Sequence, residues 1–134
     1  MKALLAISLI SASLVGCASS AMQIETDQSY QVEWIGERPL IDNSHLTITL
    51  GSDGRAYGTA GCNHWFASYT LDGDNIRFEQ PGSTRKMCPP ALMEQETRFL
   101  QSLPTITRWD FSETDQLRLW PNQGKPLRLW PITN

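Results

Sequence analysis

The sequence predicts an α+β domain that consists mainly of antiparallel β-strands and contains one α-helix. Two observations lead to this prediction. Several short segments alternate apolar and polar residues between turns rich in glycine and aspartate, whereas only one segment has the periodicity of a helix. The chain has 134 residues, and the 118 that remain after an expected loss of residues 1–16 suit one domain with a hydrophobic core.

The first residues resemble the signal peptide and lipobox of a bacterial lipoprotein. Lys2 precedes an apolar run, residues 3–15, which is shorter than the roughly 20 apolar residues that span a bilayer. The run ends in the lipobox-like Leu14-Val15-Gly16-Cys17. The resemblance implies that residues 1–16 are a cleaved signal peptide. It also implies that Cys17 becomes an acylated mature N-terminus, whose palmitate-like chains anchor the protein to the membrane.

The residues after Cys17 predict a location. Ala18 stands where an aspartate would resemble the inner-membrane retention signal of enterobacteria, so we expect the outer membrane, with the protein facing the periplasm. Residues 17–29 are small or polar and predict a lipidated tether, and residues 30–134 are the expected domain. Without Lys2 the chain has 10 basic and 14 acidic residues and no basic patch, which argues against a nucleic-acid partner.

An antiparallel meander is predicted for the first half of the domain. Leu46, Ile48 and Leu50 alternate with threonines, which is typical of a strand with one buried face. Turns at residues 51–54 and 72–75 separate further strands. The expected strands are 45–50, 55–60, 65–71 and 76–79, followed in the second half by 105–111.

One helix is predicted, from Pro89-Pro90, which suit a first helical turn, to about Leu103. On a helical wheel the apolar stripe comprises Leu92, Phe99, Leu100 and Leu103. Glu96 falls inside this stripe, whereas Glu94 and Arg98 point away from it.

The chain ends in a repeat that predicts a β-hairpin. The sequence Leu-Arg-Leu-Trp-Pro occurs at 117–121 and again ten residues later, and two registers keep its leucines on one face. Pairing Leu119 with Leu129 is preferred, because the tighter register sets Arg118 directly against Arg128 and like charges repel. The preferred register has two further cross-strand pairs, Trp120 with Arg128 and Arg118 with Trp130.

These tryptophans and arginines form an outward-facing ladder that has two interpretations. One is a binding face for glycans or for another protein. The other, which is favoured, is cation–π protection of the outer surface of the sheet. The prolines at the strand ends also oppose edge-to-edge pairing with another sheet.

Three motifs together resemble the META domain. They are Gly58-Thr59-Ala60-Gly61-Cys62-Asn63, Tyr69-Thr70-Leu71-Asp72-Gly73-Asp74 and Thr84-Arg85-Lys86-Met87-Cys88-Pro89, the last leading to Met93, Glu96, Phe99 and Leu103. The similarity extends from Tyr30 to Ile132 and is that of the HslJ-like heat-shock lipoproteins. It implies a curled sheet or partly open barrel packed around one helix. It also implies a role in envelope stress and antibiotic tolerance, without an established catalytic activity.

The cysteines form the first candidate site. Once Cys17 is lipidated, Cys62 and Cys88 can pair in the oxidising periplasm, and a disulfide between them is the favoured interpretation. The bond would stabilise the fold by about 3–4 kcal/mol on the chain-entropy model. Two alternatives remain open. They are a metal site in which His64 and His45 join the cysteines, and a Cys62 nucleophile with His64 as its base.

Glu96 is the second candidate site, because a carboxylate on the buried face of a helix requires hydrogen-bond donors. The expected partner is the Gly61-Cys62-Asn63 loop, through its backbone amides or the Asn63 side chain. A structural brace is favoured over a general acid, since the sequence places no second carboxylate or nucleophile beside Glu96. No phosphate-binding glycine loop, nucleophile elbow or His-Glu metal motif occurs in the sequence, and no cofactor is expected.

The sequence therefore predicts a non-catalytic outer-membrane lipoprotein that supports envelope integrity by binding an unidentified protein or small molecule. Two alternatives are kept. A carrier of an apolar ligand or acyl chain requires a large apolar cavity. A periplasmic inhibitor that presents His64-Trp65-Phe66 to an enzyme requires Trp65 and Phe66 to be exposed. A packed core with neither feature favours a scaffold role.

Overall fold

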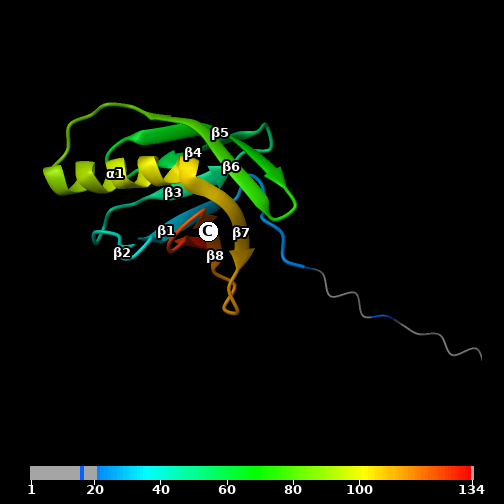
Figure 1. Cartoon of the computed structure of the whole chain (residues 1–134). Helices are drawn as coiled ribbons and strands as arrows, with labels where there is room; N and C mark the ends of the chain where they lie inside the picture. Colours follow the sequence, from blue (N-terminus) through cyan, green and yellow to red (C-terminus); the bar gives the residue numbers. More distant parts are fainter. Residues whose placement is uncertain (1–15, 17–20, 134) are drawn as a thin grey trace, which may run out of the picture.

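The structure is a computed structural model that describes residue 16 and residues 21–133, so the expected lipidation site, Cys17, lies outside the described residues, as do residues 1–15. The described part forms one antiparallel sheet and one α-helix (Figure 1). The elements in chain order are β1 (Ser29–Ile35), β2 (Arg38–Pro39), β3 (Thr47–Leu50), β4 (Arg55–Thr59), β5 (His64–Asp72), β6 (Asn75–Ser83), α1 (Pro90–Ser102), the 3-10 helix η1 (Leu103–Thr105), β7 (Ile106–Phe111), β8 (Leu117–Pro121) and β9 (Leu127–Pro131).

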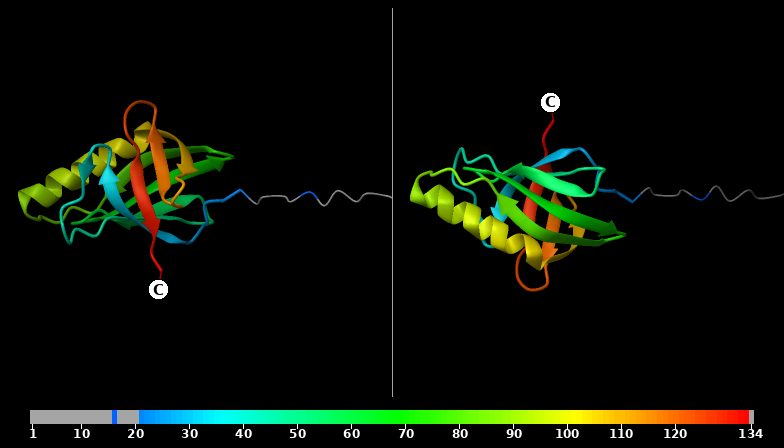
Figure 2. Two further views of the ribbon diagram at one scale, coloured as in Figure 1. Left: turned by 90° about the horizontal axis from the view of Figure 1, so that it is seen from below. Right: turned by 90° about the horizontal axis from the view of Figure 1, so that it is seen from above.

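The sheet closes into a barrel because β1 pairs with β3 on one side and with β9 on the other. Tyr30 lies opposite Pro131 and Ile35 lies opposite Leu127. Figure 2 shows the first and last strands crossing the same face of the barrel. In the described residues β1 and β3 to β9 form the closed barrel, and β2 pairs only with the end of β1. The expected fold class, a mainly antiparallel α+β domain curled around a helix, is confirmed.

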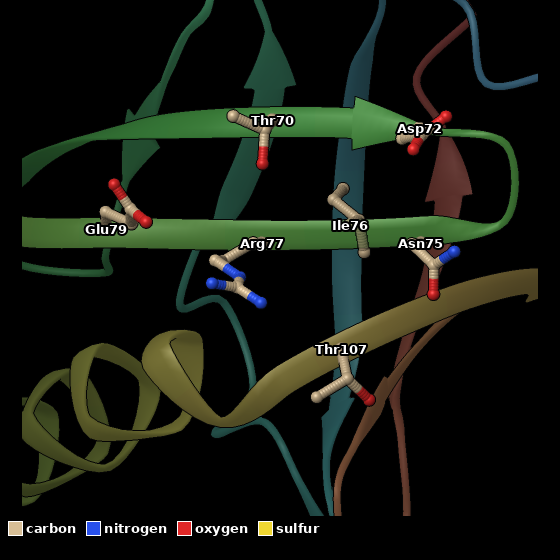
Figure 3. Close-up of a pocket in the computed structure, with 7 residues that line it drawn as sticks. All are labelled: Thr70, Asp72, Asn75, Ile76, Arg77, Glu79 and Thr107. Atoms are coloured by element: carbon tan, nitrogen blue, oxygen red, sulfur yellow. The ribbon is translucent and has the colours of Figure 1, made fainter.

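The least paired seam of the barrel lies between β6 and β7. These strands pair only at Asn75 and Arg108, whereas β5 and β6 pair along most of their length. Beyond this point β7 diverges from β6, and η1, which follows α1 in the chain, lies beside β6 (Figure 3). Phe99 and Leu103 are fully buried. The helix therefore covers the part of the core that strand pairing leaves open.

Side chains from alternating strand positions fill the interior of the barrel. Leu46 is fully buried and Ile48 and Leu50 are each 2% exposed, as expected for this strand. Thr49, expected on the exposed face, is also buried at 4% exposure, so the predicted alternation is wrong at this position. The largest fully buried side chains include Trp65 and Phe99, whose rings meet edge to face with their centroids 5.2 Å apart. Each such side chain contributes roughly 1.5–3 kcal/mol by leaving water. The interior of the barrel is therefore a packed hydrophobic core.

The helix has close to its expected limits but a different rotation. Phe99 and Leu103 are buried as expected, while Leu92 and Leu100 are only half-buried. Gln95, which the expected apolar stripe does not include, is fully buried. The helix therefore turns a polar pair, this glutamine and the glutamate that follows it, toward the barrel.

The expected tether is in part packed against the barrel. Ile24 is 7% exposed and belongs to the hydrophobic core. The backbone N–H of Asp27 donates to the carbonyl of Leu50 at 2.7 Å. Contacts with the barrel thus begin before residue 29, the expected end of the tether. A single isoleucine in a polar stretch has no period from which its burial could be predicted.

The terminal hairpin adopts the register that the sequence analysis argued against. The observed pairs are Leu117 with Leu129, Arg118 with Arg128 and Leu119 with Leu127. The predicted pairs, Trp120 with Arg128 and Arg118 with Trp130, are therefore wrong. The leucines nevertheless face the core as expected, because both registers have the same parity.

Neighbouring strands explain why the two arginines can face each other. Asp110 of β7 lies opposite Arg118 and accepts two hydrogen bonds from its guanidinium, both at 2.7 Å. The guanidinium of Arg128 lies over the ring of Trp34 in β1, 5.3 Å from its centroid. An argument confined to the hairpin could not include these partners, because they come from β7 and β1.

The charge of Asp110 depends on the same contacts. Burial raises the pKa of its carboxyl group, but hydrogen bonds from Arg118 and Trp120 and the positive charges of Arg118 and Arg108 outweigh burial, so the pKa lies below its ordinary value of 3.8. A lowered folded-state pKa means that Asp110 stabilises the fold above the unfolded-state pKa. This contribution is lost as the pH falls through the folded-state pKa.

We expect Asp110→Asn to lower the free energy of unfolding at neutral pH by about 1 kcal/mol, a value kept small because the ion pair is partly exposed. The variant would leave Arg118 facing Arg128 without its counter-charge. The difference from wild type should shrink as the pH falls below about 4, where Asp110 of the unfolded chain takes up a proton, and should disappear below the lowered pKa of folded Asp110. Thermal unfolding followed by circular dichroism measures both effects.

The matched control for this variant is Glu113→Gln, which removes a carboxylate from the exposed segment between β7 and β8. We expect it to leave the melting temperature nearly unchanged. If both variants lowered the melting temperature equally at neutral pH, the ion pair would not be what allows the observed register.

Candidate functional site

A disulfide joins Cys62 to Cys88 and confirms the expected pairing. The two Cα atoms are 6.0 Å apart, although the residues are separated by 26 positions in the sequence. The bond ties the loop between β4 and β5 to the segment that leads into α1. Because both sulfur atoms are in the disulfide, neither the metal site with His64 and His45 nor the Cys62 nucleophile is assembled among the described residues.

The Asn63 side chain is the centre of a hydrogen-bond cluster beside this disulfide. Its Oδ1 accepts from the backbone N–H of Lys86 at 2.6 Å and from the hydroxyl of Thr84 at 3.0 Å. Its Nδ2 donates to the carbonyl of Lys86 at 3.3 Å and to Oε2 of Glu96 at 3.1 Å. Two accepted and two donated bonds use the carboxamide fully. Asn63 thereby joins the start of β5 to the segment before α1 and to α1 itself.

Gly61 lets the chain bring Asn63 into this position. Its φ of +99° lies in the left-handed region, where a side chain would be strained. The backbone N–H of Ala60 donates to the carbonyl of Asn63 at 2.8 Å, which closes the turn. The Gly-Cys-Asn motif therefore makes a turn, a covalent tie and a hydrogen-bond centre in three successive residues.

Glu96 lies in α1, is 5% exposed and faces Asn63. The hydrogen bond expected from the Gly61–Asn63 loop is present, and the Asn63 side chain donates it. The second carboxylate oxygen, Oε1, is also buried and has no hydrogen-bond partner within the described part of the chain. A buried acceptor without a donor is costly, and this distinguishes Glu96 from the other members of the cluster.

Gln95 is a buried polar residue that the sequence analysis missed. Its Oε1 accepts from the backbone N–H of Ile41 at 2.8 Å, and its Nε2 donates to the hydroxyl of Ser44 at 2.9 Å. These bonds attach the segment between β2 and β3 to the helix. A signal was available, because Gln95 precedes Phe99 by four positions and therefore shares a face of the helix with it.

An open cleft of about 470 Å³ lies between α1 and the segment that precedes it. Glu96 lies in its lining beside apolar surface from Met93 and Leu100. Arg85 and Lys86, both exposed, line the same cleft. Glu96 is therefore part of the cleft wall, while its unpaired Oε1 has almost no exposed surface of its own.

A second open cleft, of about 520 Å³, lies where β6 and β7 diverge. Figure 3 shows Arg77 and Glu79 on β6, Thr70 on β5 and Thr107 on β7 around it. Arg77 and Glu79 are exposed. This cleft follows from the open seam of the barrel, and it lacks the buried titratable group that the cleft beside α1 contains.

The segment His64-Trp65-Phe66, predicted as a possible binding face, begins β5. Trp65 is 1% exposed, and its indole N–H donates to the carbonyl of Thr47 at 2.9 Å. His64 and Phe66 are exposed, and Phe66 lies opposite Tyr57 of β4. The requirement that Trp65 be exposed is not met, because strand alternation turns it into the core.

The predicted ladder on the hairpin lies on its outer face. Its members, all half-buried, are Arg118, Trp120, Arg128 and Trp130. The indole N–H of Trp120 donates to Asp110 and that of Trp130 donates to Glu33, each at 2.8 Å. Arg108 lies over the Trp120 ring, 4.6 Å from its centroid. Because both indole groups have partners within the protein, the protective interpretation of the ladder is favoured.

Two further features of residues 21–133 limit the site. No group of three histidine, cysteine, aspartate or glutamate side chains in this range is arranged to hold a metal ion. None of its helices has the length and apolar character needed to cross a membrane.

Comparisons with known proteins agree with this geometry. The family model of the META domain matches residues 21–133. A protein from Burkholderia xenovorans, solved by NMR, is 24% identical; the match covers 89% of this chain and 98% of that chain, with a TM-score of 0.69. A second NMR structure is 21% identical over 76% of this chain and 86% of that chain, with a TM-score of 0.59. At such identities these structures show a shared fold alone. No curated protein matches the chain.

We expect Glu96→Ala to lower the free energy of unfolding by about 1–3 kcal/mol, because it removes the Glu96 partner of the buried Asn63 amide and leaves a small cavity. Glu94→Ala is the control on the outer face of the same helix. Glu94 pairs with Arg38 and Arg98 at the surface, so its loss should barely change the melting temperature. Equal small effects would contradict the brace.

Replacing both Cys62 and Cys88 by serine should lower the free energy of unfolding by about 2–4 kcal/mol, since the unfolded chain regains the freedom that the cross-link removes. Chemical denaturation of the oxidised wild type and the double variant measures this. Wild type with reductant should resemble the variant. Thiol labelling that finds two free cysteines in unreduced protein would contradict the disulfide.

Proposed function

Because the chain belongs to the META domain family, we propose that it is a lipid-anchored protein of the bacterial envelope that acts by binding and not by catalysis. One observation carries this proposal: the polar and cysteine side chains beside α1 form structural bonds within the protein. Gln95 and Asn63 form hydrogen bonds that hold loops in place, and both cysteines of the motif form a disulfide. No nucleophile stands beside a base in this cluster, so its chemistry supports a binding module.

The anchor in this proposal is Cys17. Ile24, which already packs into the core, is seven positions after it. A fully extended chain of that length reaches at most about 25 Å. An acylated Cys17 would therefore keep the barrel within this distance of the membrane surface. Ala18 favours the outer membrane, and the family resemblance supports a role in envelope stress and antibiotic tolerance.

Two alternative functions are a carrier of an apolar ligand and an inhibitor of a partner enzyme, and the structure argues against the first more than against the second. A carrier would need space for an acyl chain, but large side chains such as Trp65 and Phe78 occupy the barrel interior. An inhibitor would need an exposed contact surface. Tyr57 and Phe66 supply a small one, since they are 49% and 43% exposed on adjacent strands. The inhibitor thus stays the second candidate function, through this aromatic pair and not through Trp65.

The anchor is tested by Cys17→Ser in the full-length protein expressed in its envelope. We expect the wild type to sediment with membranes and to carry the mass of attached acyl chains, and the variant to be soluble. Ser19→Ala, which changes the same segment but keeps the lipobox, is the control and should stay on the membrane. An unmodified wild type, or a variant that still sediments, would overturn the anchor.

The binding role is tested by crosslinking the acylated protein in intact envelopes and isolating what is attached to it. We expect a defined partner to be recovered in the same yield with Glu94→Ala. A reproducible partner that is lost with Tyr57→Ala and Phe66→Ala would favour the inhibitor, because those residues form the exposed aromatic pair.

A further inference from the structure

The segment between β6 and α1 contains a run of exposed residues, Thr84 to Met87. Met87 has the highest exposure among the large apolar side chains of the described residues, 84%. Figures 1 and 2 show the segment at the end of the molecule away from residues 21–28, through which the chain joins the proposed anchor. An anchor attached there leaves this segment accessible to a protein in the periplasm.

Hydrogen bonds and the disulfide fix the backbone of this exposed segment. The N–H of Thr84 donates to the carbonyl of His64 at 3.0 Å. The N–H and the carbonyl of Lys86 are both bonded to the Asn63 carboxamide, at 2.6 and 3.3 Å. Two positions later, the disulfide holds Cys88. A segment that is fixed before it meets a partner loses little conformational entropy on binding.

The same bonds decide which backbone groups of the segment face outward. In an extended chain, successive residues direct their N–H and C=O groups to opposite sides. Thr84 and Lys86 direct theirs toward the protein, so Arg85, which lies between them, directs its own to the outside. Arg85 is exposed, and its guanidinium forms no ion pair within residues 21–133. It therefore presents a positive charge together with outward backbone groups.

Serine proteases recognise this combination of features. They bind an extended segment through its backbone groups and place the side chain that precedes the cleaved bond in a specificity pocket. The pocket of trypsin carries a carboxylate, which pairs with the guanidinium of an arginine. Lys86 is also a cation, but its backbone groups are already used by Asn63. The geometry thus selects Arg85 for the pocket.

We propose that residues 84–88 form an inhibitory loop for a serine protease of trypsin-like specificity, with Arg85 in the specificity pocket. Cleavage would add water across the Arg85–Lys86 peptide bond and give a carboxylate on Arg85 and an amine on Lys86. The hydrogen bonds of Thr84 and Lys86 hold both new ends in place, so the bond re-forms with loss of the same water. The inference rests on the proposal that the protein acts by binding, and it names the class of partner.

The test is inhibition of trypsin by the full-length mature protein in detergent, measured with a chromogenic arginine anilide substrate. We expect a Ki below about 1 µM. Chymotrypsin, whose pocket is hydrophobic, should not be inhibited. Mass spectrometry of the oxidised protein after the assay should find most of the chain uncleaved.

Two neighbouring cations provide the decisive variant and its matched control. Arg85→Ala should weaken the inhibition of trypsin at least about 30-fold, the effect of losing one dominant interface side chain. Lys86→Ala removes an equal charge at the next position and should weaken it less than about fivefold. Arg85→Leu should transfer the inhibition from trypsin to chymotrypsin. Both side chains are exposed, so these variants should keep the wild-type melting profile.

The contribution of the fixed backbone is tested by reducing the disulfide in the wild type. Freed from the disulfide, the segment should inhibit more weakly and be cleaved after Arg85 more rapidly. The double variant Tyr57→Ala and Phe66→Ala changes the exposed aromatic pair on β4 and β5 and should inhibit as wild type.

Four outcomes would overturn the proposal. They are no inhibition of trypsin by about 100 µM protein, rapid cleavage after Arg85 in the oxidised protein, equal losses with Arg85→Ala and Lys86→Ala, and a loss of inhibition with the aromatic double variant. None of them depends on the anchor or on a crosslinked partner, so failure of this inference and failure of the proposed function are distinguishable.

Discussion

The architecture depends on one sparsely paired seam in the closed barrel. Pairing of β1 with β9 brings residues from the two ends of the domain together, and the remaining strands follow in chain order until β6 meets β7 at only one pair, Asn75 with Arg108. An open seam would expose apolar side chains to water, so the helix that connects these strands has to cover it. Phe99 and Leu103 supply the cover. The position of α1 on the barrel follows from this seam, and so does the burial of Gln95 and Glu96, which α1 carries.

A helix that covers a barrel must also hold the loops it passes, and this explains its buried polar pair. Gln95 binds the segment after β2, and Glu96 binds Asn63 at the start of β5. The disulfide between Cys62 and Cys88 adds a covalent tie at the second of these points. Buried polar groups of this kind cost free energy unless they are paired, so they stabilise one arrangement of helix and loops above others. The Oε1 atom of Glu96 is the exception, because it is buried without a hydrogen-bond partner in residues 21–133.

The outer face of the hairpin shows how neighbouring strands decide a register. Within the hairpin alone, Arg118 opposite Arg128 is unfavourable. Within the barrel, Asp110 neutralises the first arginine and the ring of Trp34 receives the second. The same Asp110 also accepts from the Trp120 indole, so one carboxylate organises much of this surface. The leucines of the two Leu-Arg-Leu-Trp-Pro segments thus pack inside the barrel. Their arginines and tryptophans lie on its outer face, where they contact partners from neighbouring strands.

The sequence pattern by itself determined the secondary-structure elements, including the strand around Ile48, the helix after Pro90 and the turns between strands. Each of these depends on residue periodicity or turn residues within a few positions of the chain. The pattern also determined that Glu96 is buried, because Leu92 and Leu100 bracket it, and the cysteine count determined the disulfide. Only the tertiary structure decided the hairpin register, the burial of Ile24, and the unpaired oxygen of Glu96. Each of these depends on side chains from distant segments, and such contacts leave no period in the sequence.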